Sequence, residues 1–276
     1  MPEATFTFTA IKYAPMHSLL KLPCMLLFTA AALFSGLLPA QVKYGTVNYT
    51  ASPSFTVSST GEELPGGDKI EKMLRDLHAG GGFDKQYSLT FTPDAFVFRE
   101  KDEKDQTVEE GDLTVTILRN QTDPEIFYTD TETDTYTNQE AIADQLFLHD
   151  GSVPPLAWTL RDATLPASDA TLGFDLRTAT AVTESGDTLT AAYAPALAVP
   201  FGPLNYYGLP GAILQLDVCR VGKCTRYRAV SMEVRSERPD LELPRKGKKV
   251  NRQSFLRARD KYRSRRTRTS IQTFQN

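Results

Sequence analysis

A turn that leads directly into an alternating strand, within residues 202–218, constrains most strongly how this chain can fold. Pro210 presets φ at the second position of the turn, and Gly211 can adopt the positive φ that a type II turn requires at its third position. Apolar residues then occupy alternate positions from Ala212 to Val218, which is the period of a half-buried strand. The turn should set the register of this strand, because a slip of one residue would exchange its two faces.

Two adjacent aromatic residues, Tyr206 and Tyr207, precede this turn and follow an earlier break at Gly202-Pro203. Aromatic side chains at strand ends usually pack against the sheet, so we expect these rings to cover its base. The alternative is that they line a ligand groove.

The hexapeptide Gly208-Leu209-Pro210-Gly211-Ala212-Ile213 resembles the signature of the GLPGLI family, which comprises exported proteins found mainly in Bacteroidetes-type bacteria. Ala212 replaces the second leucine of the family name, and Gly202-Pro203 matches the family upstream. Segments 41–49, 87–98, 153–160 and 173–179 are similar to further family blocks in the same order, so the resemblance covers nearly all of the chain after residue 40. The family has no established biochemical function, and the resemblance implies export rather than an activity. We call the following residues the signature turn: Gly202, Pro203, Tyr206, Tyr207, Gly208, Leu209, Pro210 and Gly211.

Residues 1–40 have the pattern of a secretory signal, and Met16 is an alternative initiator within them. A basic residue precedes an apolar run over 22–38, and small residues precede the expected cleavage after Ala40. An uncleaved membrane anchor is the alternative, although proline and glycine residues interrupt the run and leave it short for a spanning helix. Cys24 follows a proline early in the run, which disfavours lipidation. We therefore expect an exported protein that is periplasmic or associated with the outer membrane.

Cys219 and Cys224 are the two cysteines that remain after the predicted signal. Val221-Gly222 between them is suited to the bend of a hairpin, which would place the two thiols opposite each other. Because an exported protein meets oxidising conditions, a cross-strand disulfide is the first hypothesis. A redox-active pair is the alternative, but the spacing is not Cys-x-x-Cys. In the resemblance, Leu176 stands where the family often has a cysteine, which removes one other thiol partner.

The remaining pattern predicts a single, mainly β (α+β) domain over residues 41–243. One convincing amphipathic helix is expected near 68–78, because its apolar residues recur at spacings of three, four and seven. Short strands separated by turns predict a curved antiparallel sheet or a partly closed barrel on which this helix packs. The expected strands are 41–49, 87–91, 95–98, 113–118, 125–128, 189–193, 212–218 and 226–234.

Residues 244–276 form a strongly basic tail, with twelve lysine and arginine residues against one acidic residue, Asp260. A solvated, partly disordered tail is the favoured interpretation, and Asn251 is a candidate N-cap for a short helix weakly faced by Phe255 and Tyr262. Anionic membrane surfaces, an envelope protein or the acidic body of the chain would suit this charge, whereas export argues against nucleic acid. The basic residues are Arg245, Lys246, Lys248, Lys249, Arg252, Arg257, Arg259, Lys261, Arg263, Arg265, Arg266 and Arg268.

Catalytic and metal-binding patterns are scarce. His78 is expected at a helix end and His149 in a turn, and no nucleophile elbow, phosphate loop or zinc spacing accompanies them. The alternating acids of 130–134 could hold Ca²⁺ on a strand, but an EF-hand loop would need glycine and glutamate where the chain has Thr135 and Ala141. A solvated loop is the simpler interpretation of these acidic residues. For the chain as a whole, we predict no enzyme activity, cofactor or metal.

Two functions follow from these features. The first is an interaction protein that docks on an outer-membrane assembly or membrane surface through the signature turn and the basic tail. The alternative is a periplasmic carrier that holds a lipid, a peptide or another apolar ligand in a groove of the sheet, for which a cavity of several hundred Å³ would be required.

Overall fold

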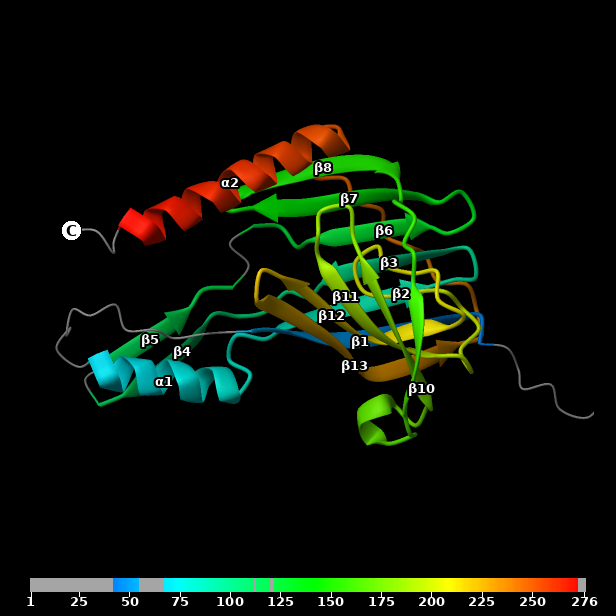
Figure 1. Ribbon diagram of the computed structural model, residues 1–276, viewed down its shortest axis with the longest axis horizontal. Coiled ribbons are helices and arrows are strands. Elements are labelled where there is room, and N and C mark those ends of the chain that lie inside the picture. The colour runs from blue at the N-terminus through cyan, green and yellow to red at the C-terminus, as the bar shows by residue number, and fades with distance from the viewer. Residues whose placement is uncertain (1–41, 55–66, 112, 120–121, 273–276) are drawn as a thin grey trace, which may run out of the picture. The chain divides into compact units, whose positions relative to one another are not determined.

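The computed structural model describes residues 42–54, 67–111, 113–119 and 122–272. The predicted signal at 1–40, including Met16 and Cys24, lies outside the described residues. From Gln41 onward the chain forms one compact unit, and Figure 1 shows its elements.

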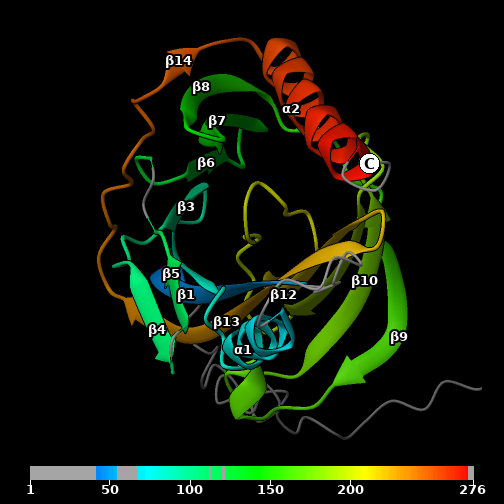
Figure 2. The same cartoon turned by 90° about the vertical axis from the view of Figure 1, so that its left-hand side faces the viewer.

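The predicted mainly β architecture is confirmed. Twelve strands form one curved sheet in the order β14-β8-β7-β6-β3-β2-β1-β13-β12-β11-β10-β9, and β4 pairs with β5 in a separate hairpin. The sheet does not close into a barrel, so β14 and β9 are its two edges (Figure 2). Its strands are β1 (Tyr44–Pro53), β2 (Lys85–Phe91), β3 (Ala95–Glu100), β6 (Ile126–Asp130), β7 (Thr135–Ile142), β8 (Gln145–Ser152), β9 (Thr159–Leu165), β10 (Leu176–Val182), β11 (Thr188–Ala194), β12 (Ala212–Arg220), β13 (Lys223–Arg235) and β14 (Lys248–Lys249). The hairpin comprises β4 (Gln106–Glu110) and β5 (Leu113–Ile117), and the helices are α1 (Gly67–Ala79), the short η1 (Asp169–Thr171) and α2 (Arg252–Gln272).

The core packs against the central strands and is rich in aromatic side chains. Tyr87 stacks on Phe98 with ring centroids 4.6 Å apart, and Phe91 stacks on Phe201 at 4.3 Å. The buried hydroxyl of Tyr49 donates a 2.7 Å hydrogen bond to the carbonyl oxygen of Ile213, which ties β1 to the start of β12. Strands distant in sequence therefore share one core.

The strand after the signature turn forms as predicted, but the turn itself differs from the prediction. Gly211 has φ +145°, which is not the type II value, and its amide donates to the carbonyl of Leu209 at 2.7 Å. A Cβ atom at Gly211 would lie 2.7 Å from the carbonyl carbon of Ala194, so glycine is required for close backbone approach as well as for its φ. Ile213 and Leu214 lie on opposite faces of β12 and are both buried, so the start of this strand is buried on both faces rather than on one.

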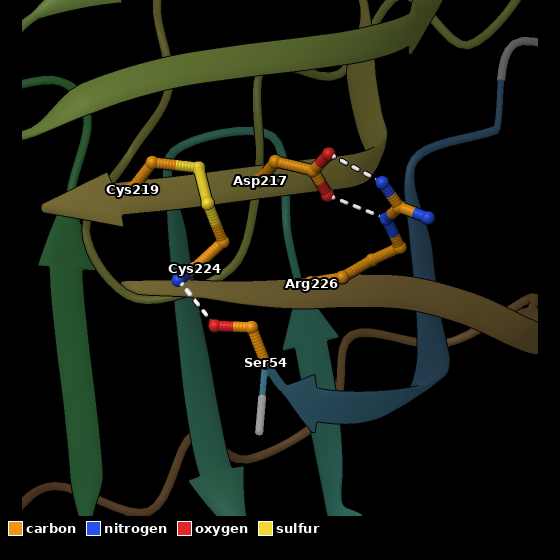
Figure 3. Close-up of a disulfide and its surroundings, with 5 residues drawn as sticks. All are labelled: Ser54, Asp217, Cys219, Cys224 and Arg226. Carbon is orange, nitrogen blue, oxygen red and sulfur yellow. Dashed lines mark hydrogen bonds and ion pairs between the residues drawn. A yellow bond between two sulfur atoms is a disulfide. The ribbon is translucent and has the colours of Figure 1, made fainter. Parts of the chain in front are cut away.

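The predicted hairpin disulfide between Cys219 and Cys224 is present (Figure 3). Val221 and Gly222 have φ of 46° and 75°, which is the backbone of a two-residue hairpin turn that matches the twist of the strands. Figure 3 also shows the side chain of Ser54 accepting a 2.7 Å hydrogen bond from the Cys224 amide, so that the end of β1 is attached to this hairpin.

The predicted helix near 68–78 is present as α1, and the basic tail forms α2, a helix of 21 residues that is longer than the short helix expected there. In α1, Met73 is buried, and the ring of His78 lies 3.0 Å from the carbonyl oxygen of Pro53. In α2, the side chain of Asn251 accepts a hydrogen bond from the Ser254 amide at 2.8 Å, which confirms the predicted cap. Within the described ranges, neither helix has the length and apolar character needed to cross a bilayer.

Candidate ligand cavity beneath the C-terminal helix

A cavity of about 840 Å³ lies where β6–β8, the signature turn, the β10–β11 connection and α2 meet. Its apolar lining includes Phe127, Leu156, Leu204, Tyr206 and Val218. Its polar lining comes from β7, β8 and α2, and also from the β10–β11 connection, which contributes Glu184 and Asp187. A volume in this range suits a small organic ligand with both apolar and polar parts.

The C-terminal segment forms one side of this cavity. Strand β14 pairs in parallel with β8, opposite Phe147 and Leu148, and thereby fixes where α2 begins. Phe255 of α2 is only 2% exposed, and its ring stacks on the His149 ring at 4.1 Å. Arg252, at the start of the helix, forms an ion pair with Glu184 of the β10–β11 connection at 3.1 Å. The helix therefore connects the β8 side of the curved sheet to the β10–β11 side, as Figure 2 shows.

A network of polar side chains lies on the cavity wall formed by β7 and β8. His149 and Asn138, which face each other in the strand register, are each 4% exposed. Both contact one oxygen of Glu140: His149 Nε2 lies 2.9 Å from Oε1, and Asn138 Nδ2 donates to it at 3.0 Å. Asn138 Nδ2 also donates to Asn205 Oδ1 at 2.7 Å, which links the wall to the signature turn. Glu140 is thus held in place by two neighbours.

Glu125 is the lining residue with the most strongly perturbed carboxyl group. Burial, reinforced by the negative charge of Glu140, raises the pKa of Glu125 to about 7. The Ala141 amide donates to its Oε1 at 3.1 Å. At neutral pH the Glu125 side chain is therefore present in both its charged and its protonated form.

The two tyrosines of the signature turn have different environments. The Tyr207 hydroxyl contacts Asp134, its ring lies edge-on to Phe96 with centroids 6.0 Å apart, and its carbonyl accepts the indole hydrogen of Trp158 at 2.9 Å. Tyr207 therefore covers the sheet, as expected. Tyr206 instead lines the cavity, and burial raises its pKa to about 12, so it remains a neutral hydroxyl. The alternative interpretation of these aromatic residues thus applies to Tyr206.

The rest of the signature turn is mostly part of the core. Gly202, Pro203 and Leu209 are buried, whereas Gly208 and Pro210 are exposed. A Cβ atom at Gly202 would lie 3.0 Å from that of Ile213, so this glycine allows the loop to pack against β12. Within the signature turn, Tyr206 therefore lines the cavity, whereas the buried residues hold the loop against the sheet.

The basic residues of the C-terminal segment are dispersed rather than gathered at one point. Lys246 pairs with Asp123 at 2.6 Å, Arg252 pairs with Glu184, and the guanidinium of Arg259 lies over the Phe255 ring at 5.8 Å. Arg245, Lys248, Lys249, Arg257, Lys261 and Arg263 are exposed, and Arg265, Arg266 and Arg268 belong to the last part of α2.

The residues that sequence reasoning missed are the polar ones of β7 and β8. The His-Asp-Gly sequence suggested a turn at His149, but this residue lies inside β8 and is buried, so that expectation is wrong. Strand pairing with β7 overrides the local turn preference there. The sequence of β7 could have predicted this polar wall, because Tyr136, Asn138 and Glu140 occupy every second position and therefore share one face of the strand. The acids of 130–134 form the β6–β7 turn, in which Asp130 accepts two backbone amides.

Comparisons with known proteins identify no family for this chain. No protein-family description matches it, and no curated protein matches it. Among solved structures, PNGF-II in its P21 crystal form aligns at 10% identity and a TM-score of 0.47 over 80% of this chain, and its C2 form aligns at 12% and 0.45 over 79%. The chain spans about a third of the length of these structures, 34% and 33% respectively.

Proposed function

We propose that this chain is an exported binding protein that holds a small ligand with apolar and polar parts in the cavity beneath α2. The observation that carries the proposal is the cavity of about 840 Å³, which has apolar side chains on one side and the Glu140, His149 and Asn138 network on another. The Cys219–Cys224 disulfide is compatible with an oxidising compartment outside the cytoplasm.

The experiment compares two tryptophan substitutions. Val218 lines the cavity and is half-buried, so Val218→Trp should fill it. Val230 is exposed on the neighbouring strand β13, so Val230→Trp adds the same side chain elsewhere. Binding is measured by the fluorescence of N-phenyl-1-naphthylamine, a neutral apolar dye, and circular dichroism checks that each variant folds.

We expect dye affinity to fall at least tenfold in Val218→Trp and to stay at the wild-type level in Val230→Trp. Equal dye binding by all three proteins would contradict the proposal, because the dye would then bind outside the cavity. Native mass spectrometry of the protein after exposure to its own envelope extract would identify the natural ligand by its mass.

A second function, docking on an anionic membrane surface or an envelope protein, is favoured by the exposed basic residues of α2. Arg257 and Lys261 lie one turn apart on this helix, and both are exposed. Sedimentation with phosphatidylglycerol vesicles should be weakened by Arg257→Glu with Lys261→Glu. The control carries the same charge change at Lys101 and Lys104, which are exposed before β4. Equal loss in both double variants would mean that only net charge matters.

A further inference from the structure

Helix α2 covers one side of the cavity with a single face. The residues of α2 that line the cavity recur at spacings of three and four, which places them on one side of the helix. The other side, which includes Arg257 and Lys261, is exposed. Helix α2 therefore stands between the cavity and the solvent (Figure 2). Its lining residues include Arg252, Phe255, Leu256, Arg259, Tyr262 and Arg263.

The apolar attachment of α2 to the sheet is confined to its first turn. Among residues 252–264, Phe255 alone is buried. Its ring stacks on the His149 ring with centroids 4.1 Å apart and lies edge-on to the Phe147 ring at 5.9 Å. The lining residues that follow Phe255 are half-buried or exposed. One phenylalanine therefore anchors this part of the helix.

The polar attachments at the start of α2 are few. Arg252 pairs with Glu184 at 3.1 Å, but the two side chains are 37% and 63% exposed, and exposed ion pairs contribute little to stability. Before the helix, the Val250 amide donates to the Leu148 carbonyl oxygen at 3.0 Å. Asn251 is the one residue between this bond and the first residue of α2. The helix can therefore turn away from the sheet at Asn251 while β14 stays paired.

Two buried polar atoms make the closed position of α2 costly. Arg259 Nε and His149 Nδ1 have no hydrogen-bond partner among the described residues, and neither atom is accessible to water. The cost of burying such a group is comparable with the gain from burying one apolar side chain, so it offsets much of what Phe255 contributes. Movement of α2 away from the sheet returns Arg259 Nε to water and removes the ring that covers His149.

We propose that α2 is a lid that opens about Asn251 and admits the ligand to the cavity. The structure shows the lid closed, with Phe255 as its anchor on β8. Local opening of this kind requires an element with few buried apolar contacts, which α2 is over residues 252–264. This inference rests on the proposed function and adds the route by which the ligand enters.

Stopped-flow mixing with N-phenyl-1-naphthylamine tests the lid. If opening precedes binding, the observed rate reaches a limit as the dye concentration rises, whereas entry into an open cavity accelerates in proportion to it. We expect Phe255→Ala to raise this limiting rate at least tenfold, because the anchor is lost. Arg259→Met should lower it at least threefold, because the closed position no longer buries an unpartnered guanidinium nitrogen. Gln253→Met, at an exposed position of α2, should leave the rate unchanged.

A crosslink holds the lid closed. Asp187 and Arg263 line the cavity from the β10–β11 connection and from α2, respectively. Asp187→Cys with Arg263→Cys can be joined by bismaleimidoethane, while the native cysteines stay in their disulfide. The crosslinked protein should bind and release the dye at least tenfold more slowly than the same double variant without crosslinker, at equal affinity. Equal rates in both forms would overturn the lid and leave the proposed function standing.

Hydrogen exchange followed by mass spectrometry tests the lid without any ligand. A helix lifted from the sheet loses its tertiary support and unwinds readily. The amides of 252–264 should therefore exchange at least a hundredfold faster than those of β12, and the crosslink should slow them at least tenfold. Equal protection of α2 and β12 would overturn the inference. If the dye does not bind to the folded protein but α2 exchanges rapidly, the proposed function fails and the opening of α2 stands.

Discussion

Replacing Glu125 with glutamine should change how the stability of this protein depends on pH. The pKa of Glu125 is raised from its ordinary value of 4.5 to about 7, so between these values the folded protein keeps a proton that the unfolded chain has released. Unfolding then releases a proton, and stability falls as pH rises through this window. The contribution of this group is complete below pH 4.5 and is lost above pH 7. Each pH unit between the two pKa values corresponds to about 1.4 kcal/mol, so the whole loss is about 3 kcal/mol.

Urea unfolding at pH 5, 6, 7 and 8, followed by far-ultraviolet circular dichroism, measures this effect. We expect Glu125→Gln to exceed the wild type by about 3 kcal/mol at pH 8 and by less than about 1 kcal/mol at pH 5, because the amide reproduces the protonated carboxyl group. Glu237, which is exposed after β13, provides the control, and Glu237→Gln should follow the wild-type curve. A difference between Glu125→Gln and the wild type that is constant from pH 5 to pH 8 would refute the reasoning.

Three further predictions concern stability. Gly211→Ala should lower the free energy of unfolding by about 2–3 kcal/mol, because its Cβ would overlap the Ala194 carbonyl group, whereas Gly80→Ala should change it by less than about 1 kcal/mol in the same urea titration. Reduction of the hairpin disulfide should cost roughly 2 kcal/mol, given its short loop, and a variant with both cysteines replaced by serine should no longer respond to reductant. Trp158→Phe should cost about 1 kcal/mol through loss of its hydrogen bond to the Tyr207 carbonyl, and an unchanged urea midpoint would show that water replaces this bond.

Much of the fold could be predicted from local pattern. The alternation from Ala212 to Val218 identified β12, because one face of that strand packs in the core. The spacing of Ile70, Met73 and Leu77 identified α1 for the equivalent reason in a helix. The bend between the two cysteines identified the disulfide, since a two-residue hairpin places its flanking residues opposite each other.

The candidate site could not be predicted in the same way, because it depends on pairings between distant segments. Nothing in Lys248–Lys249 has the alternation of a strand, and its parallel pairing with β8 arises from tertiary contacts. The docking of α2 depends on Phe255, whose partner His149 lies more than a hundred positions earlier in the chain. Glu125 acquires its raised pKa from burial and from Glu140, which no local pattern shows.

The two edges of the large sheet have unequal capacity to accept another strand. At one edge, β14 is only two residues long and is followed at once by a helix, which offers a second chain almost no backbone to pair with. At the other edge, β9 is seven residues long and exposed along its whole length. The large sheet could therefore join that of a second copy edge to edge through β9. In such a pair both outer edges of the joined sheet would be the short β14, which leaves little backbone for further strand addition to that sheet.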